Sequence, residues 1–366
     1  MAPGQLPLKV AKFERIGTLR DVNGKKYTRD IGCSCTLNRT PYWFFGDTFP
    51  LNDRGQMIGL LTSTYAMGNE LEPTKSKYFD TDRDGKPPQF MPFTGPEWQF
   101  NKEHQGGGKR RYYLWTFSSV AEVAPGEGYM FFDKGRTESQ RLDDNKHFGL
   151  HVGKVRVGKD RRLIAERVAE EPLFGPDECL YGGWETVVEG DHIYLYGQEK
   201  GHVYLARVPK HCPCDRSQLE YWTTRGWAHE PKDRKSLFWK LQSGTICWSR
   251  FYGCFIMVGC TMWADNKIIM RSAPRLEGPW TDDQLLWQLD PPKSGFNYCM
   301  NAHPWAFPAS EGGELLVSWT DQASGEVELA KVTWQGFQGA ASAQPTQPPA
   351  DQAPPVPRWS KPSTWF

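Results

Sequence analysis

The stretch Asp191-His-Ile-Tyr-Leu-Tyr-Gly197 and its continuation Gly201-His-Val-Tyr-Leu-Ala-Arg-Val208 together predict a β-hairpin. Both segments are rich in aromatic and β-branched residues, and the turn that joins them is short and polar. Similar aromatic or aliphatic strands recur at intervals of roughly 60 to 80 residues, which indicates a repeated structural unit. These further segments are residues 41–49, 111–117, 252–259 and 313–319.

Five repeated units without alternation of strands and helices predict an all-β fold. The last two segments continue, like residues 191–197, into a second strand, at residues 266–272 and 325–332. Such a pattern excludes doubly wound and TIM-barrel folds, which alternate strand and helix. Radial repetition of small antiparallel sheets gives a β-propeller, so we expect five blades with long loops. A β-sandwich is the alternative, but its strands would follow one another at shorter and more even intervals.

The composition agrees with a sheet protein that binds neither nucleic acid nor membranes. Aromatic residues make up 14% of the 366 residues, and 36 Gly and 28 Pro supply frequent turns. The net charge of +1 creates no overall field that would attract nucleic acid or an anionic membrane surface. No apolar run approaches the roughly 20 residues that a membrane-spanning helix needs. We expect a monomer whose partner is a small molecule or an oligosaccharide.

The chain divides into a propeller domain at residues 1–338 and a Pro-rich tail at residues 339–366. The tail contains seven prolines and only three charged residues, a composition that predicts disorder. The N-terminus shows no hydrophobic secretion signal, which favours a cytoplasmic location, or a secreted one if the chain is a processed form.

The nine cysteines predict no metal site. The pairs Cys33/Cys35 and Cys212/Cys214 have C-x-C spacing instead of the C-x-x-C spacing of zinc ribbons. Residues 80–85 match the start of a calcium loop, but its twelfth position is Met91 instead of Glu, so bidentate ligation is missing. We expect buried structural thiols, with a few disulfides as the alternative, and no cofactor.

Several motifs resemble a known group of propeller enzymes. Arg29-Asp-Ile-Gly32 followed by Trp43-Phe-Phe-Gly-Asp-Thr-Phe49 resembles the opening blade of an uncharacterised-domain family that includes endo-D-arabinanases. Ser272-Ala-Pro-Arg-Leu-Glu-Gly-Pro-Trp280 and Asn301-Ala-His-Pro-Trp305 are similar to blade segments of the more distant arabinanase/xylosidase propellers. The resemblance implies a five-bladed glycoside hydrolase-like enzyme that cleaves a furanose-containing glycan in its axial funnel. The Gly-Pro-Trp closure also occurs in unrelated propellers, and a fold alone does not define chemistry.

Three acidic residues are the candidates for catalysis, because glycoside hydrolysis uses a pair of carboxyl groups. Asp30 lies where the resembled families carry an acidic residue at the floor of the funnel. Asp47 is expected inside an aromatic strand, where a buried carboxylate must be hydrogen-bonded or functional. Glu185 stands beside Trp184 in an apolar context that would raise its pKa, as a general acid requires. The structural alternatives are a turn cap for Asp30, a backbone-binding carboxylate for Asp47 and a surface position for Glu185.

Four further residues are candidates for substrate binding. His303 and Trp305 belong to a turn at the start of the last blade, and Trp184 and Trp43 lie next to the candidate carboxylates. Indole rings bind the apolar faces of sugars and flat aromatic molecules. Because a propeller brings the inner strands of all blades to one axis, we expect Asp30, Asp47, Glu185 and His303 to converge; in a sandwich they would be scattered.

Two other functions remain open on the sequence. The high aromatic content and the absence of a secretion signal also suit a non-hydrolytic enzyme of secondary metabolism, such as a cyclase or cycloaddition catalyst. A lectin-like propeller would bind sugar without turnover. The chain lacks the G-x-x-x-x-G-K-[ST] motif of P-loop proteins and the G-x-S-x-G and H-E-x-x-H motifs of serine hydrolases and zinc proteases.

Overall fold

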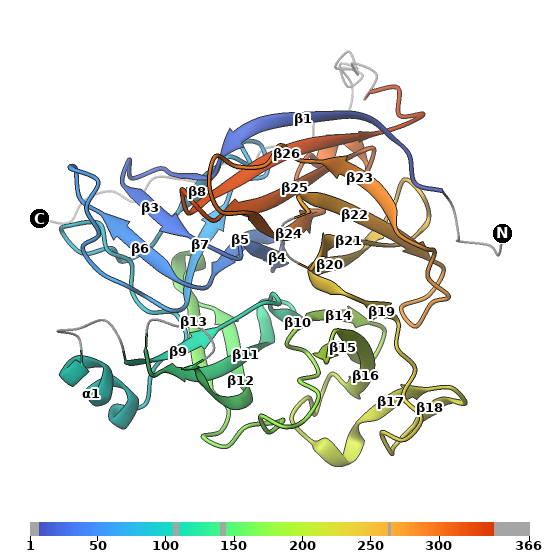
Figure 1. Cartoon of the computed structure of the whole chain (residues 1–366), viewed down its shortest axis with the longest axis horizontal. Coiled ribbons are helices and arrows are strands. Elements are labelled where there is room, and N and C mark those ends of the chain that lie inside the picture. The colour runs from blue at the N-terminus through green and yellow to red at the C-terminus, as the bar shows by residue number, and fades with distance from the viewer. Residues whose placement is uncertain (1–6, 105–109, 140–143, 263–264, 340–366) are drawn as a thin grey trace, which may run out of the picture.

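The computed structural model describes residues 7–104, 110–139, 144–262 and 265–339 and shows a five-bladed β-propeller (Figure 1). Five sheets, antiparallel except for one short parallel pair, surround a common axis. The predicted fold class is therefore confirmed. The tail predicted for residues 339–366 lies, after its first residue, outside the described residues.

The blades are given in chain order, each from its innermost strand outward. Blade 1 consists of β4 (Cys33–Leu37), β5 (Thr40–Phe45), β7 (Thr64–Gly68), β8 (Lys75–Lys77) and β2 (Arg20–Asp21). Blade 2 consists of β10 (Ala121–Ala124), β11 (Glu127–Thr137), β12 (Lys146–Val157) and β13 (Leu163–Arg167), with β9 (Arg111–Trp115) also paired to β11. Blade 3 consists of β14 (Glu185–Glu189), β15 (His192–Glu199), β16 (His202–Pro209), β17 (Glu220–Thr223) and β18 (Gly226–Ala228), with β19 (Phe238–Trp239) also paired to β16.

The remaining two blades have four strands each. Blade 4 consists of β20 (Leu241–Ser249), β21 (Cys254–Thr261), β22 (Lys267–Ala273) and β23 (Gln284–Gln288). Blade 5 consists of β24 (Asn297–His303), β25 (Glu314–Asp321), β26 (Glu326–Trp334) and β1 (Val10–Thr18). A separate two-stranded ribbon is formed by β3 (Lys26–Arg29) and β6 (Thr48–Leu51). The helical segments are α1 (Gly95–His104), η2 (Lys159–Arg161), η3 (Arg216–Gln218) and η4 (Pro308–Ser310).

The ring is closed by the N-terminal strand, which joins the last blade. Strand β1 pairs antiparallel with β26, so that blade 5 combines both ends of the described chain, as Figure 1 shows in blue and red. Arg15 of β1 forms an ion pair of 2.7 Å with Glu328 of β26. Strand β1 thus covers the edge of β26 and links the first and last parts of the fold.

The inner strands form the wall of the axis. Strands β10 and β14, β14 and β20, β20 and β24, and β24 and β4 contact one another around the ring. Outside this ring, apolar side chains fill the space between successive blades, as where Trp184 and Leu205 of blade 3 pack in one cluster with Met257 and Ile269 of blade 4. Residues far apart in sequence therefore face one axial space when they stand on inner strands.

The predicted hairpins are confirmed in three blades and need correction in two. The pairs β15–β16, β21–β22 and β25–β26 are the hairpins predicted in blades 3 to 5. In blade 2, however, residues 111–117 contain β9, which lies off the main strand order, and the second strand is β11. In blade 1, Asp47 does not lie inside a strand but between two strands. Strand β5 ends at Phe45 and pairs with β7, whereas β6 begins at Thr48 and pairs with β3 outside the blade.

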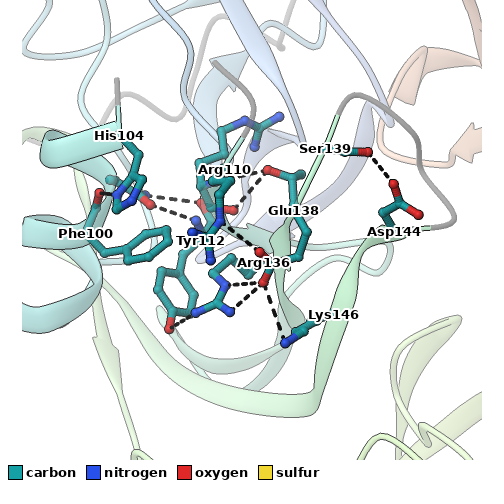
Figure 2. Close-up of polar contacts among 12 residues, drawn as sticks. Phe100, His104, Arg110, Tyr112, Arg136, Glu138, Ser139, Asp144 and Lys146 are labelled. Atoms are coloured by element: carbon teal, nitrogen blue, oxygen red, sulfur yellow. Dashed lines mark hydrogen bonds and ion pairs between the residues drawn. The ribbon is translucent and has the colours of Figure 1, made fainter. Parts of the chain in front are cut away.

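A single α-helix in the described residues packs against the edge of blade 2. Thr94 and Glu97 form a capping box at its start, with N–H···O distances of 2.9 and 3.4 Å. Asn101 of α1 exchanges hydrogen bonds of 3.2 and 2.7 Å with the Tyr112 backbone of β9. Figure 2 shows this region together with the nearby Glu138 carboxylate, which accepts hydrogen bonds from Arg110 and Arg136. These polar contacts position α1 without burying an apolar face. None of the described helices is long and apolar enough to span a membrane.

Candidate functional site in the axial cavity

A cavity of about 800 Å³ occupies the axis of the propeller. Its size lies in the range of small-molecule binding sites. Side chains from all five blades contribute to its wall, including Ser34, Ser119, Glu122, Glu185, Thr245 and Trp305. Toward its mouth it is lined by the half-exposed Trp248 near the end of β20 and by the exposed Arg250 that follows this strand. The cavity thus opens at the carboxyl ends of the inner strands.

Glu185 is the deeply buried carboxyl group of this cavity. It is the first residue of β14, and only 6% of its surface is exposed. Its Oε1 atom accepts a hydrogen bond of 2.7 Å from the Thr186 N–H group. Burial raises the pKa of Glu185 to about 8, because the backbone N–H groups of Thr186 and Ile246 compensate only part of the lost hydration. At neutral pH the group is therefore protonated and can donate a proton into the cavity.

Asp30 and Asp47 form a second acidic site at the amino end of β4. The Asp30 N–H group donates a hydrogen bond of 3.2 Å to the Asp47 carbonyl oxygen. The Asp47 carboxylate accepts hydrogen bonds of 2.8 Å from both Arg111 and Trp115. The Asp30 carboxylate accepts one hydrogen bond of 3.1 Å from the Tyr298 hydroxyl group. Burial, followed by the negative charge of Asp47, raises the pKa of Asp30 to about 7.

A chain of hydrogen bonds runs from the cavity wall to the backbone next to Asp30. The Thr245 hydroxyl group, on the cavity wall, donates to Asn301 Oδ1 at 3.2 Å. The Asn301 side chain in turn donates to the carbonyl oxygen of Ile31, the residue after Asp30, at 2.9 Å. Among the described residues, no hydrogen bond or ion pair joins either aspartate to Glu185, and neither aspartate lines the cavity. The structure thus brings Asp30 and Asp47 into direct contact, whereas Glu185 has no direct contact with either.

His303 is buried beneath the cavity wall. It is completely inaccessible, and its two ring nitrogens lie 2.6 Å from Ser34 Oγ and 2.8 Å from Ser318 Oγ. Burial lowers the pKa of His303 to about 3, so the ring is neutral. Trp305 donates its indole N–H to the same Ser34 oxygen at 2.7 Å. His303 therefore orients a serine and a tryptophan that do line the cavity.

The three candidate tryptophans occupy different positions. Trp305 lines the cavity and is 9% exposed. Trp43 is completely buried, with its ring 4.3 Å from the ring of His303. Trp184 packs between blades 3 and 4 against Tyr196 and Phe238. Of these three rings, only Trp305 is placed to touch a ligand in the cavity.

Two polar residues of the cavity wall escaped the sequence analysis. Glu122 lies on β10, and Thr186 follows Glu185 on β14. The sequence does not single out Glu122, because the short strand β10 lacks aromatic residues and the stronger strand pattern of blade 2 lies at residues 111–117. The turn at Pro125-Gly126, which follows this strand, is the sequence signal that could have revealed it.

The cysteines are all free thiols, and they are buried or half-buried. Cys35 and Cys247 line the cavity, but burial raises the pKa of each thiol to about 12, so neither is a ready nucleophile. In the described ranges, no group of three or more His, Cys, Asp or Glu side chains is arranged to hold a metal ion.

Comparison with solved structures shows the same fold in distant proteins. A candidate hydrolase from Bacteroides ovatus superposes with a TM-score of 0.60 over 87% of this chain and 86% of that protein, at 15% identity. An exo-β-1,3-galactanase from Clostridium thermocellum superposes with a TM-score of 0.50 over 87% of this chain and 62% of the galactanase, at 13% identity. No curated protein matches the sequence significantly. The sequence model of one family matches residues 26–348, and the chain belongs to that family, described as Domain of unknown function (DUF5005).

Proposed function

We propose that the protein is a glycoside hydrolase-like enzyme that cleaves a furanose-containing glycan, with Glu185 as its general acid. The observation that carries this proposal is the protonated carboxyl group on the wall of the axial cavity. A buried acid with a pKa near 8 keeps its proton at neutral pH until a glycosidic oxygen accepts it. The propeller fold shared with an enzyme named as an exo-β-1,3-galactanase supports a carbohydrate as the substrate.

Glycoside hydrolysis needs a second carboxyl group, and we assign this role to Asp30. Because Asp30 does not line the cavity, this assignment requires the substrate to extend from the cavity to the amino end of β4. With a pKa of about 7, Asp30 is ionised in a substantial fraction of molecules at neutral pH and can act as base or nucleophile. Asp47, held by Arg111 and Trp115, is assigned a positioning role through its contact with Asp30. Trp305 offers an apolar ring surface to the sugar.

The proposal is tested by measuring sugar release from arabinan, galactan and fructan. We expect Glu185→Gln and Asp30→Asn each to lower the rate by about 10²- to 10⁴-fold, the usual contribution of acid–base catalysis. Glu189→Gln is the matched control, because Glu189 lies on the same strand with an exposed side chain. Full activity in both site variants would refute the assignment of the two carboxyl groups.

The apolar part of the cavity wall favours a second candidate, a non-hydrolytic cyclase or cycloaddition catalyst. Val120, Val187 and Ile246 line the cavity together with Glu185. A protonated acid in such surroundings could protonate or hold a hydrocarbon substrate. This candidate predicts no sugar release from any glycan and conversion of a polyene or polyketide substrate that requires Glu185. A lectin-like protein would instead bind sugar without turnover and keep its affinity in the Glu185→Gln variant.

A further inference from the structure

Two acidic side chains of neighbouring inner strands face the same cavity. Glu122 lies on β10 and Glu185 on β14, and these strands contact each other. Both are close to the Cys35 thiol of β4, because the charges of both contribute to its raised pKa. The cavity therefore holds a second carboxyl group near the proposed acid, in addition to the separate Asp30 site.

The two carboxylate oxygens of Glu122 have different surroundings. Oε1 accepts a hydrogen bond of 2.6 Å from the Asn38 N–H group and one of 2.8 Å from the Gly126 N–H group. These donors belong to the turns that follow β4 and β10, so the side chain is fixed between two blades. Oε2 has no hydrogen-bond partner among the described residues. Oε1 thus stabilises the two turns, and Oε2 remains available to a ligand.

Thr186 provides a second unused polar group on the adjacent strand. It lines the cavity with 8% of its surface exposed, and its Oγ1 atom is buried without a hydrogen-bond partner in the described chain. A buried hydroxyl group without a hydrogen-bond partner is unfavourable, and a hydrogen bond to a ligand hydroxyl group would relieve this.

We propose that Glu122 Oε2 and Thr186 Oγ1 form a hydroxyl-binding subsite for an uncharged sugar ring beside Glu185. This inference rests on the proposed function, because it identifies how the hydrolase would recognise its substrate. A carboxylate oxygen accepts hydrogen bonds from sugar hydroxyl groups and repels acidic sugars. The threonine hydroxyl group can both donate and accept, so it can bind a ligand hydroxyl group as donor or as acceptor.

Glu122→Gln separates the structural role of this residue from its proposed binding role. The glutamine side chain keeps an oxygen for Asn38 and Gly126 but replaces the second oxygen with an amide NH₂ group. We therefore expect a melting temperature close to that of the wild type. We also expect binding that is weaker by about 10-fold, which corresponds to the loss of one charge-assisted hydrogen bond.

The measurement is calorimetric binding of L-arabinose, D-galactose and D-fructose to the full chain. Glu127→Gln is the control, since this exposed residue lies just after the same turn. Weaker binding in Glu122→Gln and in Thr186→Val, with unchanged binding in the control, is the expected result. Binding as tight as that of the wild type in Glu122→Gln, or no binding of any of the three sugars by the wild type, would overturn the proposal.

The binding result can be separated from the test of catalysis. If Glu185→Gln abolishes sugar release while Glu122→Gln leaves binding unchanged, the hydrolase stands and the subsite fails. If Glu122→Gln weakens sugar binding while Glu185→Gln retains full turnover, the subsite stands and the catalytic assignment fails. A large fall in the melting temperature of Glu122→Gln would show a structural role and would also overturn the subsite.

Discussion

At the scale of single residues, the environment of each carboxyl group decides its chemistry. Glu185 receives hydrogen bonds only from backbone N–H groups, so burial dominates and the acid retains its proton. Asp47 is half-buried, and its carboxylate forms an ion pair with the Arg111 guanidinium and accepts a hydrogen bond from the Trp115 indole. Asp30 lies between these cases, with one tyrosine hydroxyl group as its side-chain donor. Acid–base catalysis needs one carboxyl group that keeps its proton and a second that gives it up more readily.

The raised pKa of Glu185 also predicts how folding stability depends on pH. Its pKa rises from 4.5 in the unfolded chain to about 8 in the folded protein, so between these values the folded state binds the additional proton. Stability must therefore fall as pH increases through this interval. We expect Glu185→Gln, which cannot ionise, to gain stability relative to the wild type as pH rises from 5 to about 8.

Thermal unfolding at several pH values checks this expectation. The melting temperatures of the wild type and of Glu185→Gln should diverge with increasing pH. Glu189→Gln, with an exposed side chain, should follow the wild type at every pH. Parallel curves for the wild type and Glu185→Gln would show that Glu185 is not a protonated buried acid.

At the scale of elements, local patterns explain which parts of the fold were predictable. Strands β15 and β16, and likewise β25 and β26, have many apolar residues on both sides of a short turn, so both hairpins were predictable from the sequence. Strand β10 has four residues and no aromatic side chain, and it was overlooked. Helix α1 was not predicted because its buried side chain is the charged Glu97 instead of an apolar stripe.

Helix α1 provides a prediction at this scale. Glu97 forms ion pairs of 2.5 Å with Lys134 and 2.6 Å with Arg167 of blade 2. Glu97→Gln would leave these two cations without a counter-charge at a buried position. We expect a loss of about 3–5 kcal/mol in the free energy of unfolding, measured by urea denaturation. Glu103→Gln, on an exposed position of the same helix, should change it by less than about 0.5 kcal/mol, and equal effects would contradict the assignment.

At the scale of the whole molecule, the sequence predicted five blades but not the way in which they close. The pairing of β1 with β26 joins segments more than 300 residues apart, and no local pattern encodes such a contact. The same limit applies to the site. Asp30 and Glu185 both border inner strands, but only three-dimensional contacts reveal that hydrogen bonds through Asn301 link the cavity wall to the backbone next to Asp30. His303 lies at the end of the inner strand β24, and its burial, which depends on packing against Trp43 and Ser318, has no signal in the sequence.

The central claim is that Glu185 donates a proton to the glycosidic oxygen. The most direct test is whether the loss of kcat/KM caused by replacing Glu185 depends on the leaving group of the substrate. The measurement is kcat/KM of the wild type and Glu185→Gln on the glycan that the wild type cleaves and on the matching dinitrophenyl glycoside. A dinitrophenolate leaves without protonation, so the variant should lose about 10²- to 10⁴-fold on the glycan but little on the aryl glycoside. Equal losses on both substrates, or no loss on the glycan, would contradict the account.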